Sequence, residues 1–123
     1  MKISIDLDGT LWHYQEFFRS FMWSMQSNGH QVGILTSHKI IHECADRALL
    51  EKRAFPKPDF YIGRPLDCKG MDYAVLKSLA IREHKIDIHF DDLDADKLRT
   101  LLGNESYKLF SVMPRGRDDE HFE

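Results

Sequence analysis

Short apolar runs alternate with longer amphipathic stretches along the chain. Five runs are rich in isoleucine, valine, leucine or phenylalanine, and runs of this length predict strands that are buried on both faces. The predicted strands are 2–7, 32–35, 59–62, 86–90 and 107–112. Between them, apolar residues recur at helical spacing and predict helices over 14–27, 39–53, 70–83 and 94–102. Strands that alternate with helices predict an α/β fold, in which a parallel sheet carries helices on both faces.

The apolar stripe of each helix identifies the face that we expect to pack on the sheet. In the helix over 39–53, this stripe consists of Ile40, Ile41, Cys44, Ala48 and Leu49. In the helix over 70–83, it consists of Tyr73, Ala74, Leu76, Leu79 and Ala80. Trp12 and Tyr14 lie outside the stripe of the first helix, so we expect these two side chains to be available for contact with a substrate.

Composition and charge narrow the class of protein. The chain has 123 residues, 42% of them hydrophobic and 30% charged, which is typical of one ordinary globular domain. We expect a core over 1–113 and a charged tail over 114–123. Asp6 and Asp8 interrupt the first apolar run, and no run reaches the ~18–20 residues that span a bilayer, so we expect a cytoplasmic protein with no membrane partner. The net charge of −3 argues against general binding of nucleic acid, which we expect only as a substrate.

Acidic residues gather where two of the predicted strands end. Asp6 and Asp8 follow the first strand, and Asp91, Asp92 and Asp96 follow the fourth. Ligands of open parallel sheets bind beyond the carboxyl ends of the strands, so these carboxylates are expected to converge there. They cannot all stay ionised without a compensating charge, and oxygen ligands favour Mg²⁺. Helix capping is the alternative role for the second group of acids.

Other strand ends supply groups that suit a phosphate. Thr36 and Ser37 follow the second strand with two hydroxyls, and Lys69 opens the third helix. Lys57 and Lys39 are alternatives to Lys69, and either hydroxyl residue is an alternative helix cap. A carboxylate nucleophile, a metal, a hydroxyl and a lysine together indicate phosphoryl transfer through an acyl-phosphate.

Four stretches in this order resemble the four signatures of the haloacid dehalogenase superfamily. They are DLDGTL at 6–11, GILTS at 33–37, Lys69 in CKGMDYAVL, and FDDLDAD at 90–96. The resemblance covers nearly the whole chain, and its first signature is specific. It implies a three-layer, Rossmann-like fold with a five-stranded parallel sheet in the order 5-4-1-2-3.

The resemblance also implies a role for each matching residue. Asp6 would be the nucleophile and a Mg²⁺ ligand, and Asp8 would be the general acid and base, with its backbone carbonyl on the metal. Thr36 and Lys69 would hold phosphoryl oxygens. Asp92 would be the main metal ligand of the fourth signature, and Asp91 and Asp96 would lie close by. An aspartate at the position of Asp8 is typical of phosphatases and mutases, rather than dehalogenases.

The spacing of the signatures leaves no room for the cap domain that many members of this superfamily insert. Only 30 positions separate Asp6 from Thr36, and only 33 separate Thr36 from Lys69. The resemblance therefore implies an open site, which suits a large substrate such as a nucleic-acid end or a phosphoprotein. The alternatives are a nucleotide or sugar phosphatase closed by a second subunit of a homodimer, and a non-catalytic domain that binds metal.

Two histidines four residues apart raise one further possibility. His38 and His42 have a spacing that binds zinc on a helix, but no glutamate stands between them as the HExxH motif requires. We therefore expect both to lie on a solvated face of the second helix.

Overall fold

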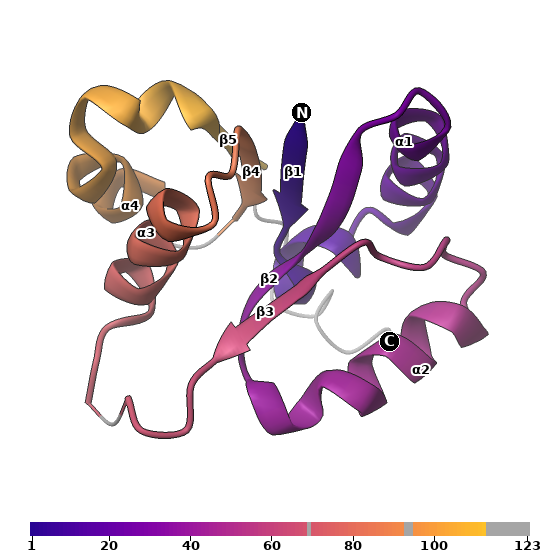
Figure 1. Cartoon of the computed structure of the whole chain (residues 1–123), viewed down its shortest axis with the longest axis horizontal. Helices are drawn as coiled ribbons and strands as arrows, with labels where there is room; N and C mark the ends of the chain where they lie inside the picture. Colours follow the sequence, from indigo (N-terminus) through magenta and orange to yellow (C-terminus); the bar gives the residue numbers. More distant parts are fainter. Residues whose placement is uncertain (69, 93–94, 113–123) are drawn as a thin grey trace.

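Five parallel strands form one sheet in the order β3-β2-β1-β4-β5 (Figure 1). A computed structural model gives the structure of residues 1–68, 70–92 and 95–112. The strands are β1 (Lys2–Ile5), β2 (Gln31–Lys39), β3 (Tyr61–Arg64), β4 (Ile88–Asp91) and β5 (Leu109–Ser111). The helices are α1 (Gln15–Ser27), α2 (Glu43–Lys52), α3 (Tyr73–Glu83) and α4 (Ala95–Leu102). The predicted α/β fold and strand order are confirmed, since 3-2-1-4-5 is 5-4-1-2-3 read from the other edge.

Helices cover both faces of the sheet and bury two apolar cores. On one face, α1 and α2 lie over β1 and β2, and on the other α3 and α4 lie over β2, β4 and β5 (Figure 1). The first core includes Ile3, Ile5, Phe18, Met22, Val32, Ile34 and Leu50. The second includes Leu35, Ile81, Ile86, Leu98, Leu102 and Leu109. Burial of each of these side chains stabilises the fold by about 1.5–3 kcal/mol, which fixes the strand ends that carry the polar residues.

Of the expected inner face of the second helix, only Leu49 packs against the first core, and the other four predicted members are exposed. Strand β2 continues to Lys39, a short turn of 3₁₀ helix follows at Ile40–His42, and α2 begins only at Glu43. Consequently Ile40 is 43% exposed and Ile41 is 62% exposed. The buried leucine of α2 is Leu50, which the sequence pattern did not single out.

The expected inner face of the third helix is confirmed at Ala74, and Ala80 packs against the second core, but the expectation is wrong at Tyr73 and Leu79. Tyr73 and Leu79 are exposed, and the buried side chains of α3 are Ala74, Lys77, Ser78 and Ile81. The helix begins at Tyr73, and Asp72 caps it by accepting a hydrogen bond from Ala74 N at 2.8 Å. Lys77 points inward and pairs with carboxylates described below.

Trp12 is a further correction, because its side chain belongs to the core. It is 3% exposed and meets the ring of Phe55 edge-on, with centroids 5.9 Å apart. Tyr14 is half-buried against the same core. The expectation that Trp12 contacts a substrate is therefore wrong.

The connections between the strands are short. Between β1 and β2 the chain forms the turn Leu7–Leu11 and α1, and between β2 and β3 it forms the 3₁₀ turn and α2. These segments hold no inserted domain, in agreement with the expected lack of a cap. Within the described residues, no helix has the length and apolar character needed to cross a membrane. The expected boundary between core and tail, after residue 113, lies outside the described residues.

Candidate functional site

Three carboxylates meet where β1 and β4 end. Strand β1 pairs with β4, with Ile5 opposite Phe90, and Asp6 N donates a hydrogen bond to Phe90 O at 3.0 Å. This register places Asp6 beside Asp91 and Asp92. One oxygen from each carboxylate lies within 4.8 Å of the other two. Asp6 is 4% exposed and Asp91 is fully buried, so the cluster is largely removed from water.

Lys77 reaches this cluster from α3 on the neighbouring layer. Its Nζ donates to Asp6 Oδ1 at 2.9 Å and to Asp91 Oδ2 at 2.6 Å. Burial lowers the pKa of Lys77, but attraction from Asp6 and Asp91 outweighs burial and leaves the pKa above its usual value. The lysine is therefore a fixed cation that holds two carboxylates together.

One ammonium does not balance three carboxylates. Burial raises the pKa of Asp6 to about 8, and repulsion from Asp91 and Asp92 adds to burial while Lys77 opposes it. Burial also raises the pKa of Asp92, with repulsion from Asp91 as the next cause. With all three carboxylates ionised, the cluster and Lys77 together carry a net charge of −2. This excess is what a divalent cation would neutralise.

A buried histidine, His89, forms a hydrogen bond with Asp91. His89 Nε2 lies 2.9 Å from Asp91 Oδ2, and His89 Nδ1 lies 2.8 Å from Ser4 Oγ. Burial lowers the pKa of His89, and the hydrogen bond to Asp91 only partly opposes this effect. For Asp91, burial raises the pKa, but the hydrogen bond from His89 and the charge of Lys77 lower it further than burial raises it. Asp91 is therefore the carboxylate of the cluster held most firmly in its ionised form.

The turn after β1 brings a glycine and a threonine against the cluster. Gly9 has φ +76°, and a Cβ at this position would stand 2.1 Å from Asp92 Oδ2. Thr10 is fully buried, with its Oγ1 3.1 Å from Asp92 Oδ1 and 3.3 Å from Asp6 Oδ2. Glycine is thus required both by the left-handed backbone and by the close approach of Asp92.

Asp8 lies at the rim of the site and is held by a histidine. Its side chain is 64% exposed, and its Oδ2 lies 2.7 Å from His38 Nε2. His38 Nδ1 lies 2.9 Å from Asp46 Oδ2, which also accepts a hydrogen bond from Tyr61 OH at 2.5 Å. Hydrogen bonds to Asp46 and then to Asp8 raise the pKa of His38 to about 10. His38 belongs to β2, so its expected place on a solvated helix face is wrong.

Thr36, Ser37 and Lys77 line one cavity of about 210 Å³ between the sheet and α3. Thr36 is 3% exposed, and its Oγ1 accepts a hydrogen bond from His38 N at 3.1 Å. Ser37 is half-buried. Lys77 also binds Asp6, so this one side chain lies between the cavity and the carboxylate cluster.

The predicted site residues fall into three groups. Asp6, Asp91 and Asp92 come together, and Thr36 and Ser37 line the adjoining cavity. Asp8 is outside the cluster, and Asp96 is exposed on the first turn of α4. Lys69 lies outside the described residues, as Figure 1 marks. Metal binding by Asp8 and Asp96 and phosphate binding by Lys69 stay predictions.

Sequence reasoning missed several residues that the fold brings to the site: Thr10, His38, Asp46, Lys77 and His89. Lys77 had a detectable signal. It stands on a stripe with Ala74, Ser78 and Ile81, and a lysine at such a position is rare unless its charge is paired. The contact of His38 with Asp8 spans 30 residues, and no local pattern predicts it.

The cluster fits Mg²⁺ by three features of the described residues. Its donors are carboxylate oxygens, which this hard cation prefers. With all three carboxylates ionised, its negative charge exceeds the charge of Lys77 by two, and Gly9 keeps the space beside Asp92 clear of a Cβ. Asp6, Asp91 and Asp92 would hold the ion, and Lys77 would balance the remaining charge.

Comparisons with protein-family models, with curated proteins and with solved structures each found no match. The functional interpretation therefore depends on the residues and geometry of the chain itself.

Proposed function

We propose that the protein is a Mg²⁺-dependent phosphate monoester hydrolase of the haloacid dehalogenase type. Asp6 is the nucleophile and passes through an aspartyl-phosphate. The observation that carries the proposal is the pairing of Asp6 with Lys77 inside a cluster of carboxylates that one ammonium leaves undercompensated. A structural ion pair needs only one carboxylate per ammonium, whereas phosphoryl transfer needs a nucleophile and a cation at the same point.

In the first step, a carboxylate oxygen of Asp6 attacks phosphorus. The new bond joins this oxygen to phosphorus, and the bond from phosphorus to the ester oxygen breaks. Lys77 binds Asp6 Oδ1 at 2.9 Å and so fixes the orientation of the carboxylate before the attack. When bound, Mg²⁺ supplies positive charge that offsets the charge of the transferring phosphoryl group.

Asp8 carries the proton in both steps. As a carboxylic acid it protonates the leaving ester oxygen, and as a carboxylate it then takes a proton from the water that attacks the aspartyl-phosphate. The second attack releases inorganic phosphate and restores Asp6. The 2.7 Å contact with His38 orients the carboxylate form of Asp8, which is the form that takes up a proton in the second step.

Phosphate release tests the proposal. The panel extends from p-nitrophenyl phosphate through nucleotides and sugar phosphates to phosphorylated oligonucleotides and phosphopeptides, each with Mg²⁺ or with a chelator. We expect Mg²⁺-dependent release that disappears in Asp6→Asn. The ranking of the substrates by rate of phosphate release shows whether the protein prefers polymeric or small substrates. Measurement of its oligomeric state shows whether a second subunit is present to close the site.

Asp87→Asn is a matched control, because Asp87 is an aspartate outside the site that accepts a hydrogen bond from Lys2 N. A folded protein that binds Mg²⁺ but releases no phosphate from any substrate would contradict the proposal and favour a non-catalytic metal-binding domain.

A further inference from the structure

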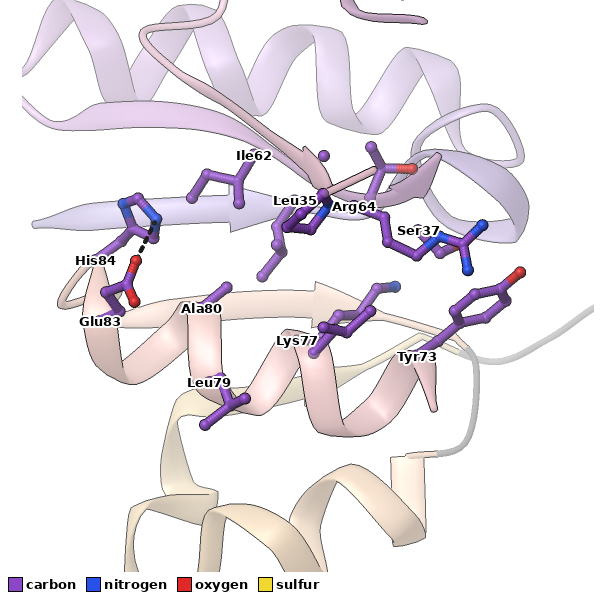
Figure 2. Close-up of a pocket in the computed structure, with 14 residues that line it drawn as sticks. Leu35, Ser37, Ile62, Arg64, Tyr73, Lys77, Leu79, Ala80, Glu83 and His84 are labelled. Carbon is purple, nitrogen blue, oxygen red and sulfur yellow. Dashed lines mark ion pairs between the residues drawn. The ribbon is translucent and has the colours of Figure 1, made fainter. Parts of the chain in front are cut away.

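The cavity beside the carboxylate cluster has a polar end and an apolar wall. Figure 2 shows Lys77, Ser37, Arg64 and Tyr73 gathered toward one end, with His84 at the other. The wall between them consists of Leu35, Ile62, Leu76 and Ala80. The polar end coincides with the carboxyl ends of β2 and β3, where a phosphoryl group on Asp6 would lie next to Lys77.

Arg64 carries a buried hydrogen-bond donor in this cavity that the described residues leave unsatisfied. Its Nε is buried, yet it has no hydrogen-bond partner among the described residues. No described carboxylate pairs with its guanidinium, in contrast to Arg47 and Arg82, which bind Glu43 and Glu105. A buried donor without a partner is costly in a folded protein, which points to an acceptor that comes from outside the chain.

A contact with Tyr73 orients the side chain of Arg64. Its Cζ lies 5.2 Å from the centroid of the Tyr73 ring, and this contact orients the plane of the guanidinium. Arg64 and Ser37 also line a second, more open hollow next to His38 and His42. Arg64 therefore borders both the cavity and this open hollow, and an anion could reach its guanidinium from either one.

We propose that Arg64 binds a second anionic group of the substrate at the polar end of the cavity, close to the phosphoryl group, while an apolar part of the substrate lies along the wall. This inference rests on the proposed phosphatase function and names its substrate class: a small phosphate monoester that carries another phosphate or a carboxylate. A planar guanidinium binds either group through two parallel hydrogen bonds. The cavity of about 210 Å³ is below the usual range for a drug-sized ligand, so it suits a skeleton of few carbons.

The test uses straight-chain alkyl phosphates of graded length that end in a methyl group, a carboxylate or a second phosphate. For each chain length, the ratio of kcat/KM between the anionic and the methyl ending measures the preference for a second anion. We expect the unmodified protein to have a higher kcat/KM for an anionic ending than for a methyl ending, and this preference should be greatest at one length of the alkyl chain. The two anionic endings show which anion Arg64 selects.

Arg64→Met keeps the alkyl stem and removes the charge. We expect it to reduce the preference roughly 10- to 100-fold, the value of a charged hydrogen bond. Arg64→Lys restores the charge without the planar fork, and we expect it to recover part of the preference. The matched control is Arg99→Met, an exposed arginine of α4, which should keep the full preference. Urea unfolding of each variant shows whether it is folded.

A binding measurement separates this inference from the proposed function. Calorimetry with Asp6→Asn and with Asp6→Asn/Arg64→Met measures affinity for the same compounds with Mg²⁺ and without turnover. Arg64-dependent affinity for anionic endings supports the subsite even if no substrate is hydrolysed, in which case the proposed function alone fails. Hydrolysis with equal preference for all endings, or an equal effect of Arg64→Met on all of them, overturns the subsite and leaves the phosphatase function standing.

Discussion

Removal of the ammonium of Lys77 should destabilise the protein more than the same change at any other lysine that the structure describes. Lys77 is 4% exposed and binds two carboxylates, at 2.9 Å and 2.6 Å. In Lys77→Met, the side chain keeps its length and its apolar stem, but Asp6 and Asp91 face one another without a cation. Repulsion between buried carboxylates, rather than a cavity, is then the cause of the lost stability.

The magnitude follows from the burial of both partners. Loss of one member of a buried ion pair costs about 3–5 kcal/mol. We expect the lower value, about 3 kcal/mol, because either carboxyl group is able to take up a proton in place of the ammonium. For a domain of this size, 1 kcal/mol corresponds to about 4 °C, so the melting temperature should fall by about 12 °C.

Urea unfolding at neutral pH, followed by circular dichroism, measures the loss. Lys97→Met is the matched control, because Lys97 pairs with Asp72 on the surface, where an ion pair contributes little. Mg²⁺ should raise the stability of Lys77→Met by more than that of the unmodified chain, since the ion replaces part of the missing charge. The reasoning would be refuted if Lys77→Met lost no more stability than Lys97→Met, or if Mg²⁺ stabilised both proteins equally.

Two other substitutions test the rim and the turn. The pKa of His38 is raised to about 10, chiefly by Asp46, so its ionic contribution to stability is complete below pH ~6.5 and is lost as the pH rises to about 10. His38→Gln should therefore lower the melting temperature more at pH ~6 than at pH ~10, and an equal loss at both would contradict the ion pair. Gly9→Ala should cost more than the ~1–2 kcal/mol of left-handed strain and should abolish Mg²⁺ binding, because its Cβ meets Asp92. The matched control is Gly103→Ala, because Gly103 also has a positive φ, +61°, but has open space around it. This variant should lose only the stability that the strained backbone costs, and calorimetry should show that it still binds Mg²⁺.

The sheet and its order were predictable from the sequence because the strand signal is local. The central strands β1 and β2 contain continuous runs of buried, mostly apolar residues, and the helices between strands permit only a few parallel orders. The carboxylates were predictable for the same reason. Asp6 and Asp91 directly end their strands, so the register of β1 with β4 brings them together without further information.

The helix faces were less predictable, because the pairing of charges overrides hydrophobicity where it is strong. In α3, Lys77 points inward and pairs with Asp6 and Asp91, whereas Tyr73 and Leu79 are exposed. The rim of the site was missed for another reason. Asp8 meets His38 across 30 residues, and that contact depends on how far β2 extends, which no local pattern gives.

Chemical trapping of the phosphorylated protein tests the central claim most directly. The protein is mixed with Mg²⁺ and a substrate, quenched in acid, digested and examined by mass spectrometry, with Asp6→Asn treated in parallel. We predict one added phosphoryl group on Asp6, sensitive to hydroxylamine as an acyl-phosphate is, and its loss in Asp6→Asn. Turnover with a phosphoryl group on another residue, or turnover that continues in Asp6→Asn, would contradict the assignment of Asp6 as the nucleophile.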